Sequence, residues 1–333
     1  MISNNVSPIF SAYGLNESEY TVQPIGTGHI HQTYLLKGTP SYILQRVNKL
    51  VFTKPEVIAN NLRAASDYLK ANHPHYLFLS PLVSIGGGEM VYDNEGYPWR
   101  LFPYFENTQT LNEVSTEAQA YQAAKGFARL THHLQHIDIN LFNPTIEKFH
   151  DLHWRYEQFQ TALKKASHDN KIVATHAIAS ATSFSFLVDQ CNALTNSQRI
   201  PVRITHNDTK INNILFNNLT GEFFCVIDLD TLMPGYFFYD LGDMVRTMVS
   251  PVSEEEKDLL KITFRKPIYY ALLEGYLSEM GGTLTAAERQ AIPFAGMMMT
   301  YIMALRFLTD FLNGNVYYHI TYADQNLVRA GNQ

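Results

Sequence analysis

The segment 204–246 contains three side chains whose types and spacing predict chemistry: Asp208, Asn213 and Asp228. Between Asn213 and Asp228 lie two short apolar stretches joined by Asn-Leu-Thr-Gly, a sequence typical of a β-hairpin turn. Oxygen ligands in ones and twos suit Mg²⁺, which keeps most of its water and completes its shell with phosphate oxygens. Asn213 and Asp228, at the open end of this hairpin, are therefore the predicted metal ligands.

The expected register of the hairpin supports this prediction. If the two strands pair directly from the turn, Asn213 lies opposite Val226. Asp228 then has the same parity as Val226 and points to the same face as Asn213, at a backbone separation of about 7 Å. Asp230, two residues further on, is expected to point to the same face.

Asp208 precedes Asn213 at the predicted turn into the hairpin. A carboxylate that stands beside a magnesium–phosphate site without binding the metal takes the proton from an attacking hydroxyl. Asp208 is therefore the predicted catalytic base, and His206 is expected to brace the loop through backbone hydrogen bonds. A single aspartate more often caps a helix or a turn, so the prediction depends on the joint spacing of the three residues.

The pattern His-x-Asp-x-x-x-x-Asn at 206–213, followed by an apolar strand and Ile227-Asp228, resembles the catalytic and metal loops of the protein-kinase-like superfamily. It is most similar to the aminoglycoside phosphotransferase and choline kinase branch. In that branch a downstream aspartate braces the catalytic loop, and Asp240 and Asp243 stand in the matching region. The resemblance implies ATP and Mg²⁺ as cofactors.

Hydrophobic periodicity predicts two lobes in an α+β architecture, and the resemblance implies that this is a protein-kinase-like fold. Residues 1–105 form a small β-rich lobe that is expected to cover the nucleotide, and residues 106–333 form a large, mainly helical lobe with the catalytic loop, the metal site and the substrate site. The predicted strands cover 20–25, 31–36, 41–47, 77–85 and 90–104, with turns at 86–88 and 94–96. The predicted helices cover about 55–70, 116–136, 145–165 and 177–194, with a mostly helical tail from 253.

Two glycines and a short connector are the candidates for nucleotide contact. Gly26 and Gly28 lie between two predicted strands, where backbone N–H groups can approach phosphate oxygens closely, although Gly-x-Gly in a hairpin is also an ordinary turn. The connector 103–107 is the expected hinge, and its Tyr104 and Phe105 are expected to contact adenine.

The third strand departs from the pattern of the superfamily. In the superfamily a lysine of this strand pairs with the phosphates, but the matching positions here are Gln45 and Arg46. Arg46 is therefore the predicted phosphate contact. Glu56 is either its partner or an ordinary acid in the first turn of a helix. Arginine and lysine are not interchangeable at such a position. A different mode of ATP binding, or a non-catalytic ATP-binding relative, therefore stays open.

Several stretches resemble N-acetylhexosamine 1-kinases, among them Tyr42 to Asn48, His206 to Lys210 and Arg306 to Asp310. That resemblance implies a small-molecule sugar substrate, phosphorylated on the anomeric hydroxyl of N-acetylglucosamine or N-acetylgalactosamine, with Arg306 and Tyr317 near the sugar. From the residues alone, Arg306 can instead pair with Asp310 at i+4, and Tyr317 can be a packing residue. Another hydroxyl acceptor, such as an amino alcohol or an aminoglycoside, also remains open.

The composition fits a globular enzyme of the cytoplasm. Twenty-five basic and 31 acidic residues give a net charge of −6, which gives no support to a nucleic-acid or anionic-membrane partner. The start of the chain lacks the basic and apolar regions of a secretory signal. The apolar, uncharged run Ala291 to Leu305 is shorter than the roughly 20 residues of a membrane span and predicts a buried helix. The sequence carries no indication of oligomeric state.

Overall fold

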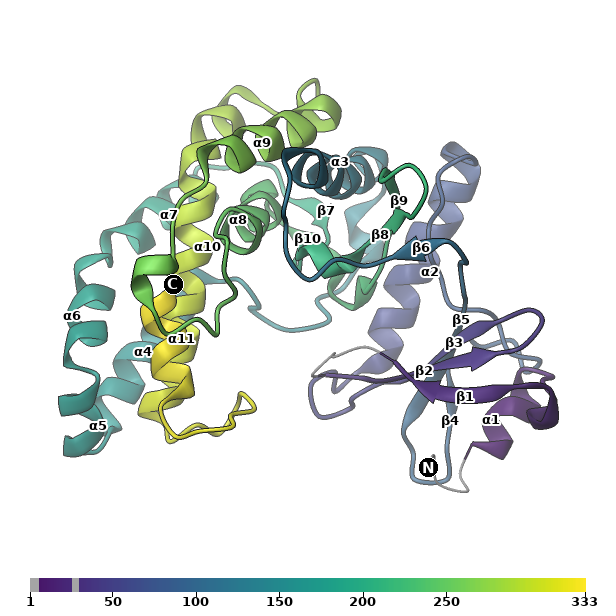
Figure 1. Ribbon diagram of the computed structural model, residues 1–333. Helices are drawn as coiled ribbons and strands as arrows, with labels where there is room; N and C mark the ends of the chain where they lie inside the picture. The colour runs from purple at the N-terminus through teal and green to yellow at the C-terminus, as the bar shows by residue number, and fades with distance from the viewer. Residues whose placement is uncertain (1–5, 26–29) are drawn as a thin grey trace. The chain divides into compact units, whose positions relative to one another are not determined.

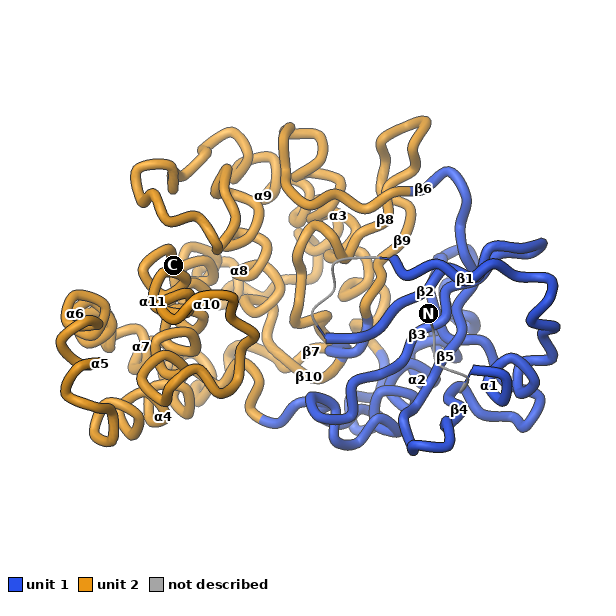
Figure 2. The backbone as a smooth tube through the Cα atoms, turned by 60° about the horizontal axis from the view of Figure 1, so that its bottom comes forward, with its two compact units in different colours: residues 1–108, 137–147, 229–232 blue, residues 109–136, 148–228, 233–333 orange. Residues whose placement is uncertain are grey.

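The computed structural model describes residues 6–25 and 30–333, and it divides into two compact units (Figure 2). Unit 1 comprises residues 1–108, 137–147 and 229–232; unit 2 comprises 109–136, 148–228 and 233–333. Two short later segments of the chain thus belong to unit 1. The predicted nucleotide-binding glycines, Gly26 and Gly28, lie outside the described residues.

Unit 1 is built on a five-stranded antiparallel sheet in the order β1-β2-β3-β5-β4 (Figure 1). Side chains of β2, β3 and β5 pack against α1 to form its core, which consists of Ile9, Phe10, Leu36, Leu44, Trp99 and Leu101. The strands are β1 (Thr21–Pro24), β2 (Gln32–Lys37), β3 (Tyr42–Arg46), β4 (Val91–Tyr92) and β5 (Pro98–Pro103); the helices are α1 (Ser7–Ala12) and α2 (Pro55–Asn72), with 3₁₀ turns η1 (Glu17–Glu19), η2 (Ile139–Leu141) and η4 (Leu229–Thr231).

One strand prediction for unit 1 was wrong. Residues 77–85 form no strand, because Pro81 has no backbone N–H to donate, and only isolated bonds such as Leu82 N–H to the Leu101 carbonyl (2.7 Å) hold this segment. The stretch 90–104 is divided into β4 and β5 at the predicted turn. Between them the Asp93 carboxylate accepts backbone N–H bonds from the turn and reverses the chain.

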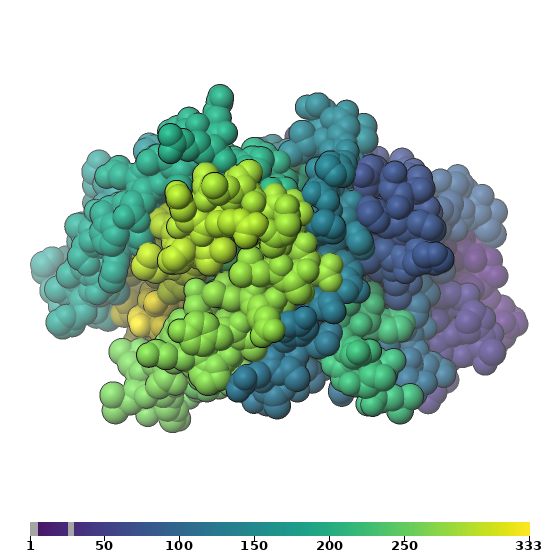
Figure 3. All heavy atoms as spheres, turned by 90° about the horizontal axis from the view of Figure 1, so that it is seen from above, coloured from purple at the N-terminus to yellow at the C-terminus, as the bar shows by residue number. Residues whose placement is uncertain are grey.

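Unit 2 is mainly helical. In it α3 packs against α9 and α10 packs against α8, and Figure 3 shows the atoms of α9 against those of α3. Gly275 of α9 permits that contact, since a Cβ there would lie 2.2 Å from the Tyr121 carbonyl oxygen. The helices are α3 (Glu117–His133), α4 (Leu152–Lys165), α5 (His168–Val173), α6 (Thr175–Ser183), α7 (Phe186–Asn196), α8 (Phe237–Met248), α9 (Lys266–Met280), α10 (Ala286–Leu312) and α11 (Gln325–Asn332), with 3₁₀ turns η3 (Ile211–Asn213) and η5 (Leu259–Lys261).

The helix boundaries follow local capping. The Thr116 side chain caps α3 by accepting the Gln119 N–H, and the Gln119 side chain completes a capping box. The helix predicted from residue 145 was wrong at its start: Asp151 accepts the Trp154 N–H, and α4 begins only at Leu152. The helix predicted over 177–194 is two helices, α6 and α7.

Two small antiparallel strand pairs carry the loops of unit 2. One joins β7 (Arg203–Thr205) to β10 (Met233–Gly235), and the other joins β8 (Ile214–Asn217) to β9 (Phe223–Val226). A short strand, β6 (Thr108–Gln109), marks the passage of the chain from unit 1 to unit 2.

The longest helix, α10, forms the centre of unit 2. By length and composition alone α10 is long and apolar enough to cross a membrane. However, α8, α4 and α11 pack on it, and more than half of its apolar window is buried. It is the core helix that the apolar run 291–305 predicts.

A buried ion pair lies in unit 1. The Arg100 guanidinium pairs with both carboxylate oxygens of Asp230 at 2.5 and 2.7 Å, and their side chains are only 2% and 3% exposed. Burial alone would raise the pKa of Asp230, but Arg100, and after it His31, outweigh burial and hold that pKa well below its ordinary range. Asp230 therefore contacts Arg100 and His31 of unit 1, and it does not continue the predicted face of the hairpin.

Arg100→Met would leave the Asp230 carboxylate buried without its main partner. We expect the free energy of unfolding to fall by about 3–5 kcal/mol, and the double change Arg100→Met/Asp230→Leu to restore most of it. The matched control is Arg63→Met, which breaks the half-exposed pair with Glu89 and should cost at most about 1 kcal/mol. Urea unfolding of the variants measures these differences; equal losses for Arg100→Met and Arg63→Met would contradict the assignment.

Candidate active site

One carboxylate holds the loop that carries the predicted base. The two oxygens of Asp240, on α8, accept the backbone N–H groups of His206 (3.0 Å) and Asn207 (2.7 Å). The hydroxyl of Thr209 donates to the Asp240 backbone carbonyl at 2.7 Å. These bonds fix the backbone on both sides of Asp208, so the bracing role that the resemblance implies falls to Asp240.

The loop takes a backbone conformation that few residues adopt. Asn207 has φ +66°, in the left-handed region where asparagine is one of the tolerated residue types. Gly235 lies directly against it, because a Cβ at that position would come within 2.8 Å of the Asn207 amide oxygen. The close approach of β10 to the loop thus requires glycine at 235.

His206 braces the same loop, as predicted. Its Nδ1 accepts the Asp208 N–H at 3.2 Å, so Nε2 carries the proton and donates to the Ile227 carbonyl at 3.0 Å. This ring therefore ties the backbone of Asp208 to the residue that precedes Asp228.

Asn213 lies against Asp208. The Asn213 amide nitrogen donates to the Asp208 carbonyl oxygen at 2.8 Å and to its Oδ2 at 3.2 Å. The amide nitrogen is thereby used, and the amide oxygen remains as the atom that can bind a cation.

The predicted hairpin register holds beside the turn, where the Asn217 N–H donates to the Glu222 carbonyl, and is wrong by one residue beyond it. An irregularity between Leu215 and Phe216 places Ile214, not Asn213, opposite Val226. Asp228 has φ +56°, so it is not an extended continuation of β9 and the parity argument fails. Asn213 and Asp228 are instead brought together by the bond from Ile227 N–H to the Asn213 carbonyl at 2.9 Å.

The oxygen donors of this site fit a hard divalent cation. Asp228 is exposed at the end of the hairpin, and it offers a carboxylate one residue after Ile227, whose N–H donates to the Asn213 carbonyl. Two protein oxygens, with water and phosphate completing the shell, are a common arrangement for Mg²⁺. The assignment of both residues as ligands stays a prediction.

The half-buried Asp208 is kept ionised by a neighbouring lysine. Burial alone would raise the pKa of Asp208, but Lys210, whose Nζ lies 3.0 Å from Oδ1, outweighs burial and holds the pKa below its ordinary value. The carboxylate is thus present throughout the neutral pH range. It is lost only when the pH falls through this lowered pKa.

At Asp240, by contrast, burial is the dominant effect. It raises the pKa of this carboxyl to about 6, against the opposing effect of His206 and of the two N–H groups. Because the folded value lies above the ordinary one, the contribution of Asp240 to stability is largest below about pH 4 and is lost as the pH rises through 6. At neutral pH, where Asp240 is ionised, its burial therefore lowers the free energy of unfolding.

Arg306, a predicted sugar contact on α10, lies among aromatic rings. Its guanidinium carbon is 5.0 Å from the centre of the Phe149 ring and 5.7 Å from that of Tyr318. The predicted alternative partner was wrong. Both oxygens of Asp310 accept backbone N–H bonds, from Val316, Tyr317 and Tyr318.

No carboxylate pairs with Arg306 among residues 6–25 and 30–333; a 3.4 Å contact with the Met303 sulfur is its one hydrogen bond to the described chain. A second guanidinium, that of Arg155, lies nearby. Burial, and after it the positive charge of Arg306, lowers the pKa of Arg155 to about 10. The surroundings of Arg306 are therefore cationic and aromatic. Tyr317, the other predicted sugar contact, is 63% exposed.

The predicted nucleotide contacts lie in unit 1. Arg46 pairs with Glu95 (3.0 Å) and lies over the Tyr97 ring (3.6 Å), so its partner is not Glu56. Tyr104 and Phe105 follow β5, where Tyr104 N–H donates to the Ser41 carbonyl. Their contacts with phosphate and adenine stay predictions.

Two polar contacts of this chain were not predicted from the sequence. Gln45, at the position of the expected lysine, accepts hydrogen bonds from the buried Arg100 at 2.5 and 2.9 Å. In unit 2, His150 is buried, with Nε2 donating to the Asn207 carbonyl at 2.8 Å. A lone arginine inside the apolar stretch 98–103 was a usable signal for the first contact, and a polar histidine beside the apolar stripe of the next helix was one for the second.

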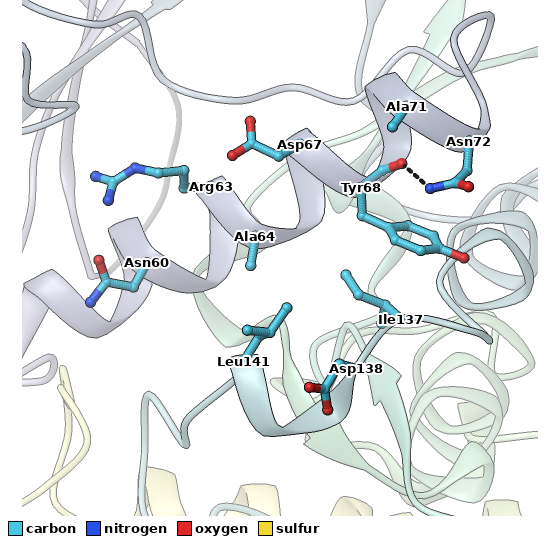
Figure 4. A pocket seen from close by; sticks show the side chains of 10 residues that line it. All are labelled: Asn60, Arg63, Ala64, Asp67, Tyr68, Ala71, Asn72, Ile137, Asp138 and Leu141. Atoms are coloured by element: carbon cyan, nitrogen blue, oxygen red, sulfur yellow. Dashed lines mark hydrogen bonds between the residues drawn. The ribbon is translucent and has the colours of Figure 1, made fainter.

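A surface groove of about 670 Å³ lies in unit 1, between α2 and the segment 137–141. Ile137 and Leu141 point toward α2 there, beside Ala64 and Tyr68 (Figure 4). None of the predicted site residues lines it.

The sequence matches the family model described as "Phosphotransferase enzyme family" over residues 21–281. The chain belongs to this family. Solved structures with a similar fold include a microcompartment-associated aminopropanol kinase (TM-score 0.65, 16% identity, 98% of this chain and 93% of that one) and an amicoumacin kinase (0.63, 15%, 98% and 90%). An ethanolamine kinase of Plasmodium vivax is also similar (0.57, 14%, 97% and 85%).

These similarities confirm the predicted α+β, protein-kinase-like fold. The amicoumacin kinase was solved with AMP-PNP and Ca²⁺, and a similar spectinomycin phosphotransferase with ADP. Kinases of this phosphotransferase family use ATP and a divalent metal, as the sequence predicts.

Asp228→Asn would remove one negative charge from the candidate metal site. We expect the affinity for Mg²⁺, or for Mn²⁺ as its spectroscopic substitute, to fall at least tenfold in the presence of nucleotide, because a neutral amide is a weaker ligand for a hard cation. Electron paramagnetic resonance of bound Mn²⁺ measures this affinity. Asp169→Asn, an exposed acid of α5, is the control and should leave it unchanged. Equal affinities for the two variants would exclude Asp228 as a ligand.

Proposed function

We propose that this chain is an ATP- and Mg²⁺-dependent kinase that phosphorylates the anomeric 1-hydroxyl of an N-acetylhexosamine. In this proposal residues 1–105 cover the nucleotide, and residues 106–333 bind the acceptor and perform the chemistry. Membership of the phosphotransferase family supports the reaction type. The sugar itself rests on the resemblance of the sequence and on one feature of unit 2.

That feature is the cationic surroundings of Arg306. A guanidinium without a carboxylate partner in the described chain, with Arg155 as its neighbour, repels the ammonium groups of amino alcohols and aminoglycosides. It favours a neutral acceptor that offers oxygen atoms as hydrogen-bond acceptors. The Phe149 ring beside it can pack against the apolar side of a sugar or an acetyl methyl group.

The residues of the loop have defined tasks in this reaction. Asp208, ionised beside Lys210, accepts the proton of the 1-hydroxyl as its oxygen attacks the γ-phosphorus, and the bond from that phosphorus to the β–γ bridging oxygen breaks. Asn213 and Asp228 would hold Mg²⁺, which when bound neutralises phosphate charge. Asp240 and His206 hold the loop backbone, so Asp208 meets the hydroxyl without a large reorganisation.

The product of the reaction tests this proposal. Incubation with ATP, Mg²⁺ and either N-acetylglucosamine or N-acetylgalactosamine should give a sugar 1-phosphate, identified by its phosphorus NMR signal and its coupling to the anomeric proton. The same assay with choline, ethanolamine, aminopropanol and an aminoglycoside should give no phosphorylated product. A 6-phosphate, or rapid phosphorylation of a cationic acceptor with no reaction of either sugar, would contradict the proposal. ATP binding without turnover on any acceptor would indicate a non-catalytic relative.

A further inference from the structure

Two buried polar atoms beside Arg306 have no hydrogen-bond partner within the described part of the chain. They are Nδ1 of His150 and the hydroxyl of Tyr318. A buried polar group without a partner costs about 1–3 kcal/mol, and native proteins keep few of them. Two such atoms in one place therefore suggest that a ligand supplies the missing bonds.

Both atoms belong to the surroundings of Arg306. The Tyr318 ring lies 5.7 Å from its guanidinium. The His150 ring lies 4.3 Å from the Phe149 ring, which is itself 5.0 Å from that guanidinium. His150 is also an electrostatic neighbour of Asp208, so this cluster lies near the predicted base.

The hydrogen-bonding character of each atom follows from its surroundings. His150 donates through Nε2 to the Asn207 carbonyl, and burial lowers the pKa of its ring to about 3, so the neutral ring presents Nδ1 as an acceptor. The Tyr318 hydroxyl and the Arg306 guanidinium present donors. The cluster thus offers one acceptor, two kinds of donor and the apolar face of Phe149.

We propose that His150 and Tyr318, together with Arg306, form a subsite for a secondary amide of the acceptor. An acetamido group has one N–H to donate to His150 Nδ1, one carbonyl oxygen to accept from Tyr318 or Arg306, and a methyl group to pack on Phe149. The proposal rests on the proposed function and extends it to the residues that select the substrate. In the free chain both atoms are closed off from water, so the acetamido group displaces the side chains that cover them.

Tyr318 lies in the segment between α10 and α11, which has no helix or strand (Figure 1). Asp310 holds this segment by accepting the N–H groups of residues 316–318, and its Oδ2 also accepts from the Asn326 amide. The Tyr318 hydroxyl takes no part in that arrangement. Its removal therefore leaves the loop intact.

Tyr318→Phe tests the donor side of the subsite. We expect unchanged or slightly higher thermal stability, because the change removes an unpaired buried hydroxyl. We expect kcat/KM for N-acetylglucosamine to fall about tenfold and that for glucose, which lacks the amide, to stay within about twofold. The matched control is Tyr322→Phe, whose buried hydroxyl in the same loop also has no partner in the described chain but whose ring contacts Lys257. That variant should keep the wild-type selectivity.

A substrate analogue tests His150 without altering the loop that this residue supports. 2-O-acetylglucose replaces the amide N–H by an ester oxygen, which faces Nδ1 without a proton to donate, so we expect kcat/KM about tenfold below that of N-acetylglucosamine. Equal rates with the ester and the amide, or an equal loss for Tyr318→Phe on N-acetylglucosamine and glucose, would overturn the subsite while leaving the kinase assignment intact. Failure to phosphorylate any hexose would remove both.

Discussion

The carboxylate of Asp240 is the interaction on which the candidate active site depends. Its two oxygens accept the N–H groups of His206 and Asn207, and this pair of bonds holds a backbone that turns into the left-handed region at Asn207. Asp208 is the next residue, and its carbonyl and carboxylate position the Asn213 amide. The geometry of the base and of one metal ligand therefore follows from a single buried carboxylate. Its raised pKa shows that this carboxylate is kept at a cost in stability.

Several arginines of the described chain pair with carboxylates, and Arg306 does not. Arg100 pairs with Asp230, Arg246 pairs with Asp243 and Glu254, and Arg203 pairs with Glu288. In each pair the carboxylate neutralises the charge of the guanidinium. Arg306, by contrast, has aromatic neighbours, a like charge and a thioether sulfur within the described chain. A cation that the fold does not neutralise is available to a ligand, and this is the physical basis for proposing a neutral acceptor.

Short-range features of the site were predictable from the sequence. The spacing of Asp208 and Asn213 lies within one loop, and the apolar strands and turn that follow specify a hairpin, so their proximity required no long-range information. The strand irregularity and the positive φ of Asp228 were not predictable in this way, because a single extra residue in a short strand leaves the hydrophobic pattern almost unchanged. The hairpin therefore brings Asn213 next to Ile227, the neighbour of Asp228, but not through the register that the sequence predicted, and the metal site itself stays a prediction.

Long-range pairings set the limit of the sequence analysis. No lysine stands near position 45, so Arg46 was predicted as the phosphate contact. The buried cation that contacts Gln45 is instead Arg100, on the neighbouring strand. Helical spacing made Asp310 the alternative partner of Arg306, but Asp310 accepts N–H groups of the following loop. The sequence does not predict how that loop is placed. In both cases the prediction used the nearest charged residue in the sequence, whereas the observed partner lies elsewhere in the same unit.

The most direct test of this account is a double-mutant cycle between Asp240 and Asp208, measured as kcat for phosphorylation of N-acetylglucosamine. If Asp240 acts by positioning the loop, Asp240→Asn alone should lower kcat about tenfold to a hundredfold. In the Asp208→Asn background the same change should cost less than about threefold, because the base that it positions is already absent. A full, additive loss in that background would show that Asp240 does not act through Asp208, and it would contradict the account.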